Sequence, residues 1–390
     1  DEPTTALDVT VQKEILLLLK ELQAQTKMGM IFITHDLGVI ADLADQVAVM
    51  HQGKIVEYGN VTQVIENPQH PYTQGLLACR PSQKIRLKRL PVVKEFLENK
   101  WPGGLAQLQA ELVLSLEERA LNHRLMYEKE TILKVEDLKT WFQSSQGFLR
   151  RTYTQVKAVD GISFDVFPGE TLGLVGESGC GKTTLGRSIL RLQQATSGNV
   201  FYKGLDVNQL DKKQMTALRK KMQIIFQDPY SSLNPRISVG EAILEPMKVH
   251  GLHENNHLRR EKVYELLEQV GLEATHYQRY PHEFSGGQRQ RICIARALAV
   301  NPELIICDEP VSALDVSVQA QVLNLLNRLK KEYGFTYIFI SHDLSVVRYM
   351  SDRVLVMNKG KMVELAEADD LYENPQNEYT KKLIEAIPGR

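Results

Sequence analysis

Short apolar runs alternate with longer amphipathic stretches through the C-terminal two-thirds of the chain. The runs have the length and composition of buried strands, and the stretches carry apolar residues at helical spacing. We expect strands at residues 132–138, 162–166, 171–175, 223–226, 304–307 and 336–340, and helices that begin at Thr183, Ser285 and Val316. This alternation predicts an α/β fold with a largely parallel central sheet, in which ligands bind at the carboxyl ends of the strands.

The first 81 residues nearly repeat residues 308–388 without a gap. Adding 307 to each number takes the Asp-Glu-Pro at 1–3 to the same tripeptide at 308–310, and the His-Asp-Leu at 35–37 to that at 342–344. Self-similarity at a fixed offset indicates two copies of one structural unit.

The second copy follows a long segment of its own domain, and no such segment precedes the first copy. We therefore expect residues 1–81 to be the C-terminal part of a first domain, residues 82–130 to be a linker and residues 131–390 to be a complete second domain. In the linker, residues 105–127 predict one amphipathic helix. We favour a helix that is only part of the linker, and the alternative is a helix that docks on a partner protein. The apolar residues at helical spacing are Leu105, Leu108, Leu112, Leu116 and Ala120.

Residues 176–184 read Gly-Glu-Ser-Gly-Cys-Gly-Lys-Thr-Thr, between an expected strand and an expected helix. This pattern in this context predicts a P-loop, whose backbone N–H groups close around phosphates at a helix N-terminus. We expect ATP and Mg²⁺ as ligands, with Lys182 bridging the phosphates and Thr183 binding the metal ion. The predicted nucleotide-binding residues of the loop are Gly176, Ser178, Gly179, Cys180, Gly181, Lys182, Thr183 and Thr184.

The apolar run 304–307 ends in two carboxylates, Asp308 and Glu309. In a P-loop protein, a carboxylate at this strand end holds Mg²⁺, usually through water, and we assign Asp308 to that role. Glu309 is positioned to act on the attacking water and is the predicted general base. On its own such a pair would more often be a solvated strand end, and the neighbouring P-loop favours the catalytic interpretation.

Residues 284–288 read Phe-Ser-Gly-Gly-Gln at an expected helix start, where bare backbone N–H groups point at an anion. With the P-loop and the carboxylate strand, this resembles the nucleotide-binding domain of ATP-binding-cassette proteins, whose signature reads Leu-Ser-Gly-Gly-Gln. The resemblance covers residue 132 to the C-terminus, and the tail of the same family covers residues 1–81. It implies a P-loop NTPase fold with a helical subdomain and an antiparallel β subdomain.

The resemblance also implies roles for residues outside the P-loop. Gln227 is similar to the Q-loop glutamine, which senses Mg²⁺ and the attacking water, and His342 resembles the switch histidine that contacts the γ-phosphate. Phe142 is the best match for the aromatic residue that stacks on adenine, with Trp141 and Tyr153 as rivals. The implied nucleotide ligands of the signature and the D-loop are Ser285, Gly286, Gly287, Gln288 and Asp315.

Two further stretches resemble the ATPase subunits of bacterial oligopeptide and dipeptide importers, which also occur as fused double forms. They are residues 227–236 and the Glu-Asn-Pro-Gln segment that occurs at both 66–69 and 373–376. The implied function is ATP hydrolysis that energises import of peptides or of related solutes such as nickel or glutathione. The implied partners are two transmembrane permease subunits, a second cassette domain and, indirectly, a periplasmic or extracellular solute-binding protein. The implied location is the cytoplasmic face of the inner (plasma) membrane.

Cassettes of this family pair head to tail, so that the P-loop of one and the signature of the other hold the same ATP. Residues 1–81 keep Glu2, Asp8 and His35 but have no P-loop, Q-loop or signature. We therefore expect one molecule of this chain to complete neither composite site. It should bind ATP and hydrolyse it poorly unless two complete domains pair between molecules.

Charge and cysteine content narrow the alternatives. The 47 Lys and Arg residues nearly balance the 48 Asp and Glu residues, which argues against a nucleic acid partner, and the four cysteines form no zinc-type CxxC pair. One alternative is a non-transport ATPase with two cassettes, such as a ribosome-associated translation factor, for which the basic residues at 84–89 are the support. A non-catalytic regulatory copy is the other, and Glu309 and His342 argue against it.

Overall fold

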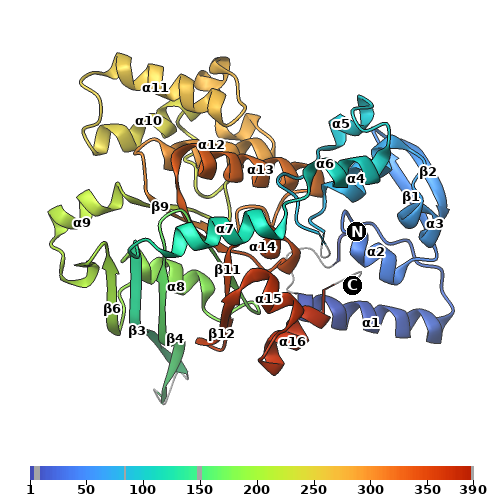
Figure 1. The fold of residues 1–390 in the computed structure, drawn as a ribbon, viewed down its shortest axis with the longest axis horizontal. Helices are drawn as coiled ribbons and strands as arrows, with labels where there is room; N and C mark the ends of the chain where they lie inside the picture. The colour runs from blue at the N-terminus through green and yellow to red at the C-terminus, as the bar shows by residue number, and fades with distance from the viewer. Residues whose placement is uncertain (4–8, 83–84, 147–151, 388–390) are drawn as a thin grey trace.

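The computed structural model describes residues 1–3, 9–82, 85–146 and 152–387. Figure 1 shows a central sheet with helices on both sides and the first copy beside it. None of the helices in these ranges is long and apolar enough to cross a membrane.

A six-stranded sheet forms the centre, in the order β12-β11-β5-β10-β9-β8. Five strands are parallel, and only β12 runs antiparallel to its neighbour. Every residue of β5, β9 and β10 is buried, as expected for parallel strands covered on both faces. The predicted α/β fold with a largely parallel sheet is confirmed. The strands are β5 (Thr171–Val175), β8 (Met222–Ile225), β9 (Leu304–Asp308), β10 (Thr336–Ile340), β11 (Arg353–Asn358) and β12 (Lys361–Glu367).

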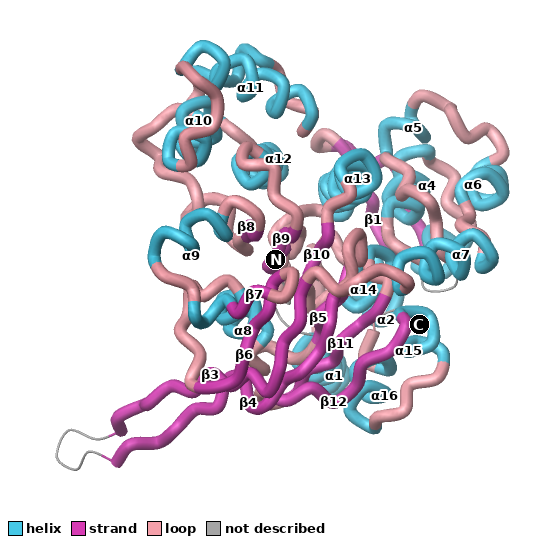
Figure 2. The backbone as a smooth tube through the Cα atoms, turned by 60° about the vertical axis from the view of Figure 1, so that its left-hand side comes forward, coloured by secondary structure: helices cyan, strands magenta, loops and turns pink. Residues whose placement is uncertain are grey.

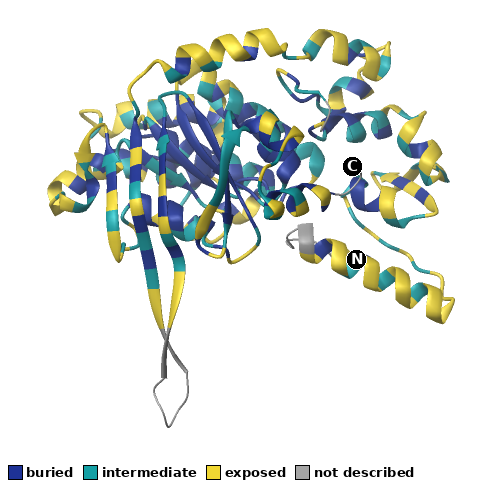
Figure 3. Cartoon of the chain, turned by 60° about the horizontal axis from the view of Figure 1, so that its bottom comes forward, coloured by how far each residue is buried: buried dark blue, intermediate teal, exposed yellow. Residues whose placement is uncertain are grey.

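Alternate residues of the central strands build two separate cores. Ile306 and Ile338 face α8 (Lys182–Ile189), whereas Ile305 and Tyr337 face α12 (Gly286–Leu298) and α13 (Val316–Tyr333). Successive side chains of a strand point to opposite faces, so α8 and α12 cover opposite faces of the sheet. Figure 3 shows the strands between them as the most deeply buried part of the molecule.

A second sheet is antiparallel, in the order β4-β3-β6-β7, and shares the core on the α8 side. Its strands are β3 (Leu133–Gln146), β4 (Thr152–Val166), β6 (Ser197–Tyr202) and β7 (Leu205–Asp206). The expected strands 132–138 and 162–166 were too short, because polar residues beyond them pair across a long hairpin that extends past the sheet in Figure 2. This is the implied antiparallel β subdomain.

Three helices, α10 (Val239–Val249), α11 (Asn256–Gln269) and α12, pack together above the other face and make the implied helical subdomain. The short helix α9 (Lys212–Arg219) precedes β8 at the edge of the sheet. Pro246 lies inside α10, one turn before its end.

The sequence repeat is also a structural repeat. The elements α1 (Val9–Thr26), α2 (Leu37–Leu43), β1 (Gln46–His51), β2 (Lys54–Asn60) and α3 (Val61–Glu66) correspond at an offset of 307 to α13, α14 (Leu344–Met350), β11, β12 and α15 (Ala368–Glu373), with identical bounds. The helices α4 (Pro71–Cys79) and α16 (Glu378–Glu385) differ only in their last residue. Even the register shift after Val49 recurs after Val356.

One segment of the repeat folds differently in the two copies. Residues 336–340 form β10, whereas the matching residues 29–33 are not a strand, although both contain Ile-Phe-Ile. Ile338 is 1% exposed and Ile31 is 92% exposed. The reason is tertiary: β10 hydrogen-bonds to β5 on one side and β9 on the other, and in the described ranges no strand flanks 29–33.

The linker contains α5 (Val93–Leu97), α6 (Gly104–Leu112) and α7 (Leu116–Tyr127), so the prediction of one helix over 105–127 was wrong. Val113 leaves the helical path to form a β-bridge with Leu87, and the Ser115 hydroxyl then caps α7 by accepting from the N–H of Glu118 (3.1 Å). A periodicity that spans both helices cannot reveal this break.

The linker is docked on the second copy. Figure 1 shows α7 crossing the molecule beside α14, where Arg119 pairs with Glu367 and Asp369. Closer to the first copy, Asn324 of α13 exchanges two hydrogen bonds with the backbone of Leu90, at 2.8 and 2.7 Å. Leu90 and Val93 lie in the same core as α12 and α13, so the linker packs against the second copy and is not a free tether.

Candidate functional site

Glycines shape the loop between β5 and α8. Gly176, Gly179 and Gly181 all adopt positive φ, at 147°, 78° and 107°. A Cβ at Gly176 would collide with the carbonyl oxygen of Met357, and one at Gly181 with that of Ala158. Only glycine combines this backbone path with this close approach, so the loop is built as a tight turn that leads into the N-terminus of α8.

The Lys182 side chain folds back over this loop and is 6% exposed. Its Nζ donates to the carbonyl oxygens of Gly176 (2.6 Å) and Glu177 (3.0 Å) and lies 3.9 Å from the Cys180 Sγ. These acceptors carry no charge, and a positive charge held against neutral carbonyls at a helix N-terminus suits a phosphate. Burial raises the pKa of the Cys180 thiol, which keeps it protonated.

Thr183 and Asp308 meet where β9 ends. The Thr183 hydroxyl donates to the Asp308 Oδ1 at 2.9 Å, and Asp308 is 1% exposed. Burial raises the pKa of Asp308 above its ordinary value, although the Thr183 hydrogen bond acts in the opposite direction. A buried carboxylate beside a hydroxyl, next to a phosphate cradle, is a fitting oxygen donor set for Mg²⁺, which completes its shell with water and phosphate oxygens.

Three strand ends converge on Glu309. Its Oε2 accepts a hydrogen bond from Gln227 Nε2 (2.9 Å), and His342 Nδ1 lies 3.1 Å from the same oxygen. Gln227 follows β8, Glu309 follows β9 and His342 follows β10, so the parallel sheet brings together residues far apart in sequence. The structure places Gln227, which the resemblance links to Mg²⁺ and the attacking water, in a hydrogen bond to Glu309.

Glu309 and His342 each stabilise the charged form of the other. Burial raises the pKa of Glu309, but the hydrogen bond and charge of His342, together with the charge of Lys182 and a hydrogen bond with Ser312, outweigh it, so the net pKa lies below the ordinary value. Burial lowers the pKa of His342, but the hydrogen bond and charge of Glu309, together with the charge of Asp343, outweigh it and give a net increase. Glu309 is therefore ionised at neutral pH and held in position by two donors.

The predicted signature residues start α12. Ser285 caps the helix, and its side chain and that of Gln288 form a reciprocal capping box. A Cβ at Gly287 would collide with Val318 of α13, while one at Gly286 would lie 3.5 Å from Leu314, an ordinary contact. Asp315 caps α13 by accepting from the N–H of Val318 at 3.0 Å. These residues thus lie together over the face of the sheet opposite to α8.

The candidates for adenine stacking lie on β3 and β4, the hairpin that flanks α8. Phe142 is 38% exposed, and Lys157 sits 4.5 Å from the centre of the Trp141 ring. A hydroxyl pair, Thr140 with Ser188 (2.8 Å), fixes β3 against α8. The side chain of Tyr153 lies outside the described residues. Phe142 stays the predicted stacking residue.

Sequence reasoning missed two contacts that close the P-loop. The Glu177 N–H donates to the Tyr379 hydroxyl (3.1 Å), and the Gly360 N–H donates to the Cys180 carbonyl (3.0 Å). The Tyr-Thr pair at 379–380, repeated at 72–73, was visible in the sequence, but it served only as a mark of the importer subfamily. Nothing local places Gly360 beside the loop.

The first copy retains a small part of this site. The Glu2 N–H donates to the carbonyl of Ile33 (2.8 Å), and His35 Nδ1 lies 2.8 Å from the Glu2 Oε1. The same two contacts occur in the second copy, from Glu309 to Ile340 and His342. Asp8, which was grouped with Glu2 and His35, lies outside the described residues.

The basic run at 84–89 is engaged within the chain. Arg86 donates to the carbonyl of Tyr349, Lys88 pairs with Glu118 (2.8 Å) and Arg89 pairs with Glu95 (2.8 Å). Lys84 lies outside the described residues. These contacts give the run a role in docking the linker, which weakens its value as support for a ribosome-binding function.

Family models match both the cassette and the tails. Residues 159–312 match a model described as "ABC transporter", and residues 56–99 and 363–389 match "Oligopeptide/dipeptide transporter, C-terminal region". An ATP-binding cassette solved as a dimer in a post-hydrolysis state, bound to ADP and Pi, superposes with a TM-score of 0.54 at 28% identity, over 60% of this chain and 98% of that one. The fold is that of an ATP-binding cassette.

A second cassette structure gives the same result. The protein cbiO1 from Clostridium perfringens, part of the ABC transporter complex cbiONQ, superposes with a TM-score of 0.54 at 27% identity, over 63% of this chain and 92% of that one. Among curated proteins, the glutathione import ATP-binding protein GsiA of Escherichia coli K12 is 49% identical over 393 residues, and that of Shigella flexneri is 49% identical over 388 residues. The matches cover the whole of this chain and 60% of those relatives.

Proposed function

We propose that this chain binds ATP with Mg²⁺ and hydrolyses the ATP to energise an importer of peptides or glutathione. The observation that carries the proposal is the convergence of Gln227 and His342 on Glu309, beside a P-loop whose Thr183 contacts Asp308. A glycine-rich turn alone would not require a hydrogen-bonded carboxylate at the end of β9.

The residues divide the chemistry among them. Lys182 and the loop N–H groups hold and neutralise the phosphates, and Thr183 and Asp308 hold Mg²⁺, which when bound offsets the charge that develops on the phosphate oxygens. Ionised Glu309 accepts the proton of the attacking water. Gln227 and His342 fix the carboxylate in one orientation, so that the water is aligned before the reaction begins.

Pairing of two cassettes follows from where the signature lies. The P-loop leads into α8 on one face of the sheet, and Ser285 to Gln288 begin α12 on the other face. Ser285 and Gln288 bond each other's N–H groups, so the N–H groups of Gly286 and Gly287 in the first turn of α12 are those available to a nucleotide held by another cassette. The match to a cassette solved as a dimer supports this arrangement.

The likeness to the glutathione import ATP-binding proteins and to the oligopeptide/dipeptide transporter C-terminal region supports the transport assignment. The proposed partners are two permease subunits and a second cassette, and the proposed place is the cytoplasmic face of the inner membrane. A solute-binding protein outside that membrane would deliver the solute.

Nucleotide binding and turnover test the proposal directly. The purified chain should bind ATP in the presence of Mg²⁺, and Lys182→Ala should weaken binding at least tenfold, because it removes the cation of the loop. Lys213→Ala, an exposed lysine on α9, is the matched control. Turnover per molecule should rise with protein concentration as cassettes pair. Equal binding by Lys182→Ala, or turnover strictly proportional to enzyme down to nanomolar concentration, would contradict the ATP site or the pairing, respectively.

A further inference from the structure

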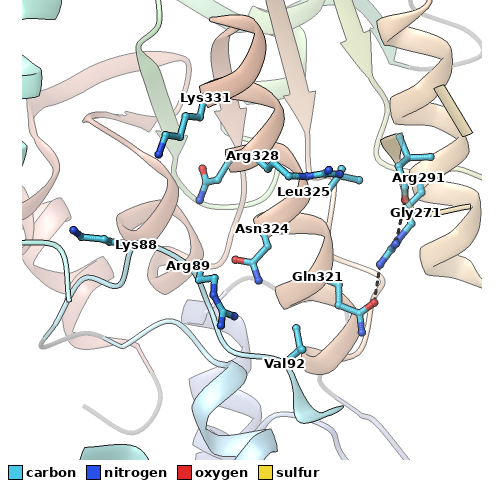
Figure 4. Close-up of a pocket in the computed structure, with 12 residues that line it drawn as sticks. Lys88, Arg89, Val92, Gly271, Arg291, Gln321, Asn324, Leu325, Arg328 and Lys331 are labelled. Atoms are coloured by element: carbon cyan, nitrogen blue, oxygen red, sulfur yellow. Dashed lines mark hydrogen bonds between the residues drawn. The ribbon is translucent and has the colours of Figure 1, made fainter. Parts of the chain in front are cut away.

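A basic cavity lies between the linker and the helical subdomain, away from the P-loop. Its volume is about 500 Å³. Figure 4 shows the linker residues Lys88 and Arg89 on one side of α13 and Arg291 of α12 on the other, with side chains of α13 between them. The residues that carry charge in its lining are Lys88, Arg89, Arg291, Arg328 and Lys331, and no carboxylate of the described residues lines it.

Three of these cations have no carboxylate partner nearby. Lys88 pairs with Glu118 and Arg89 with Glu95, both outside the lining. Arg291 instead donates to the Val270 carbonyl (3.1 Å) and the Gln321 side chain (2.6 Å).

Arg328 donates to the carbonyl of Gln269, and the ion pairs of the described residues do not include Lys331. Burial lowers the pKa of Arg291, and the nearby Arg328 lowers it further. Arg291, Arg328 and Lys331 thus bring positive charges to one cavity, where the two arginines donate only to neutral acceptors. A bound anion would offset the repulsion between these charges.

The walls of the cavity are fixed. The two hydrogen bonds between Asn324 and the Leu90 backbone hold the linker against α13, and Leu90 is fully buried. Bidentate pairing with Glu95 fixes the Arg89 guanidinium, at 2.9 and 2.8 Å. The linker wall and the buried face of α13 are therefore preformed, which lowers the entropic cost of binding there, while Arg328 and Lys331 reach the cavity from exposed positions of α13.

We propose that this cavity binds a small soluble anion that carries phosphate groups, and that the anion ties the linker to α12 and α13. Arginine forks match the oxygens of a phosphate, and the amides of Gln321 and Asn327 add neutral donors. Three cations without carboxylate partners call for an anion with at least two negative charges. A cavity of this volume holds a diphosphate or a small phosphorylated metabolite, since sites for such ligands start at about 300 Å³.

Hydrogen exchange with inorganic pyrophosphate as the probe tests the proposal on the full chain. Pyrophosphate should slow amide exchange in residues 88–92 and 321–331, relative to sodium chloride of equal ionic strength. The variant Arg328→Gln/Lys331→Gln changes two exposed residues of α13 and should raise the half-saturating concentration roughly tenfold per charge removed. Lys213→Gln, on the exposed side of α9, should behave as the unmodified chain.

The same data separate this cavity from the nucleotide site. Protection confined to residues 176–184 would report the P-loop alone and would overturn the proposal, as would equal protection of 321–331 in the double variant. Vesicles of phosphatidylglycerol supply the other source of phosphate. If they protect 88–92 and 321–331 while pyrophosphate does not, the surface contacts a membrane and the soluble-anion proposal is wrong.

Discussion

Glu309 has a backbone conformation that few side chains adopt. Its φ is 48°, a left-handed value that costs a non-glycine residue about 1 kcal/mol or more. The hydrogen bond from its N–H to the Ile340 carbonyl (3.0 Å) and the bonds from Gln227 and His342 offset this cost. Glu2, at the matching position of the first copy, has a φ of 40°. The strained residue is thus the one to which the proposed chemistry assigns the proton transfer.

Replacing Glu309 by Gln separates binding from turnover. The amide keeps the shape of the side chain but cannot accept the proton, so ATPase turnover should fall by about a hundredfold or more while ATP affinity is retained. Glu332→Gln, at an exposed position of α13, is the control. The measurements are steady-state phosphate release and equilibrium nucleotide binding. Turnover at the parental rate in Glu309→Gln would refute the assigned base.

The Glu309–His342 pair should make stability depend on pH. The raised pKa of His342 stabilises the fold fully below about pH 6.5, and the contribution is lost as pH rises through the folded pKa. The lowered pKa of Glu309 stabilises it above about pH 4.5, and the contribution is lost as pH falls through the folded pKa. The pair therefore contributes most between these two values.

His342→Gln should then cost about 1 kcal/mol in the free energy of unfolding near pH 6 and less near pH 9. Denaturant unfolding at both pH values measures the difference. His282→Gln, at an exposed position that forms no ion pair among the described residues, is the control. A gap that stays constant from pH 6 to 9 would show that the ion pair does not form.

At the scale of elements, the contact between α12 and α13 depends on one glycine. Gly287→Ala would drive a methyl group into Val318, and the helices must separate or repack, at a cost of about 1–3 kcal/mol. Val318→Ala in the same molecule should restore much of the loss, because it frees the space. Thermal unfolding of the single and double variants measures both effects.

Gly286→Ala provides the comparison for this prediction. Its new Cβ meets Leu314 at an ordinary 3.5 Å, and alanine favours helix over glycine by about 1 kcal/mol, so stability should hold or rise. Equal stability of Gly287→Ala and Gly286→Ala would show that α12 does not pack tightly on α13 at Gly287.

Elements defined by local pattern were predictable. The bounds of β5 and β10 and the start of α13 follow from apolar runs and caps that lie within a few residues of sequence. The break between α6 and α7 could not be predicted from local pattern, because it depends on Val113 pairing with Leu87, 26 residues earlier. The length of the β3–β4 hairpin depends in the same way on cross-strand partners.

The candidate site shows the same division. Motif spacing identified Lys182, Asp308 and Glu309, and the repeat drew attention to His342. Tyr379 and Glu177 are 202 residues apart in the sequence, and the local sequence around neither residue indicates their contact. Likewise, no local pattern indicated that the cations at 88–89 and 328–331 line one cavity.

Across the whole molecule, the two copies test how far local sequence decides structure. Ile-Phe-Ile at 31–33 and 338–340 has the same intrinsic exchange chemistry, yet only the second is a central strand. Amides of 338–340 should exchange about a thousandfold more slowly than those of 31–33, because their opening requires loss of two strand neighbours. Hydrogen exchange measured at the individual amides of both segments tests this difference. Equal protection would mean that 29–33 has strand partners in solution.

The helix α13 contacts both the linker and the first copy, and it begins soon after the proposed general base. Asp315 caps its N-terminus six residues after Glu309, and its 18 residues, Val316–Tyr333, make a rod about 27 Å long. Near the middle of α13, Asn324 hydrogen-bonds to the backbone of the linker, and α4 of the first copy also contacts this helix. One continuous helix therefore connects the segment that follows the proposed general base with the contacts that hold the linker and the first copy.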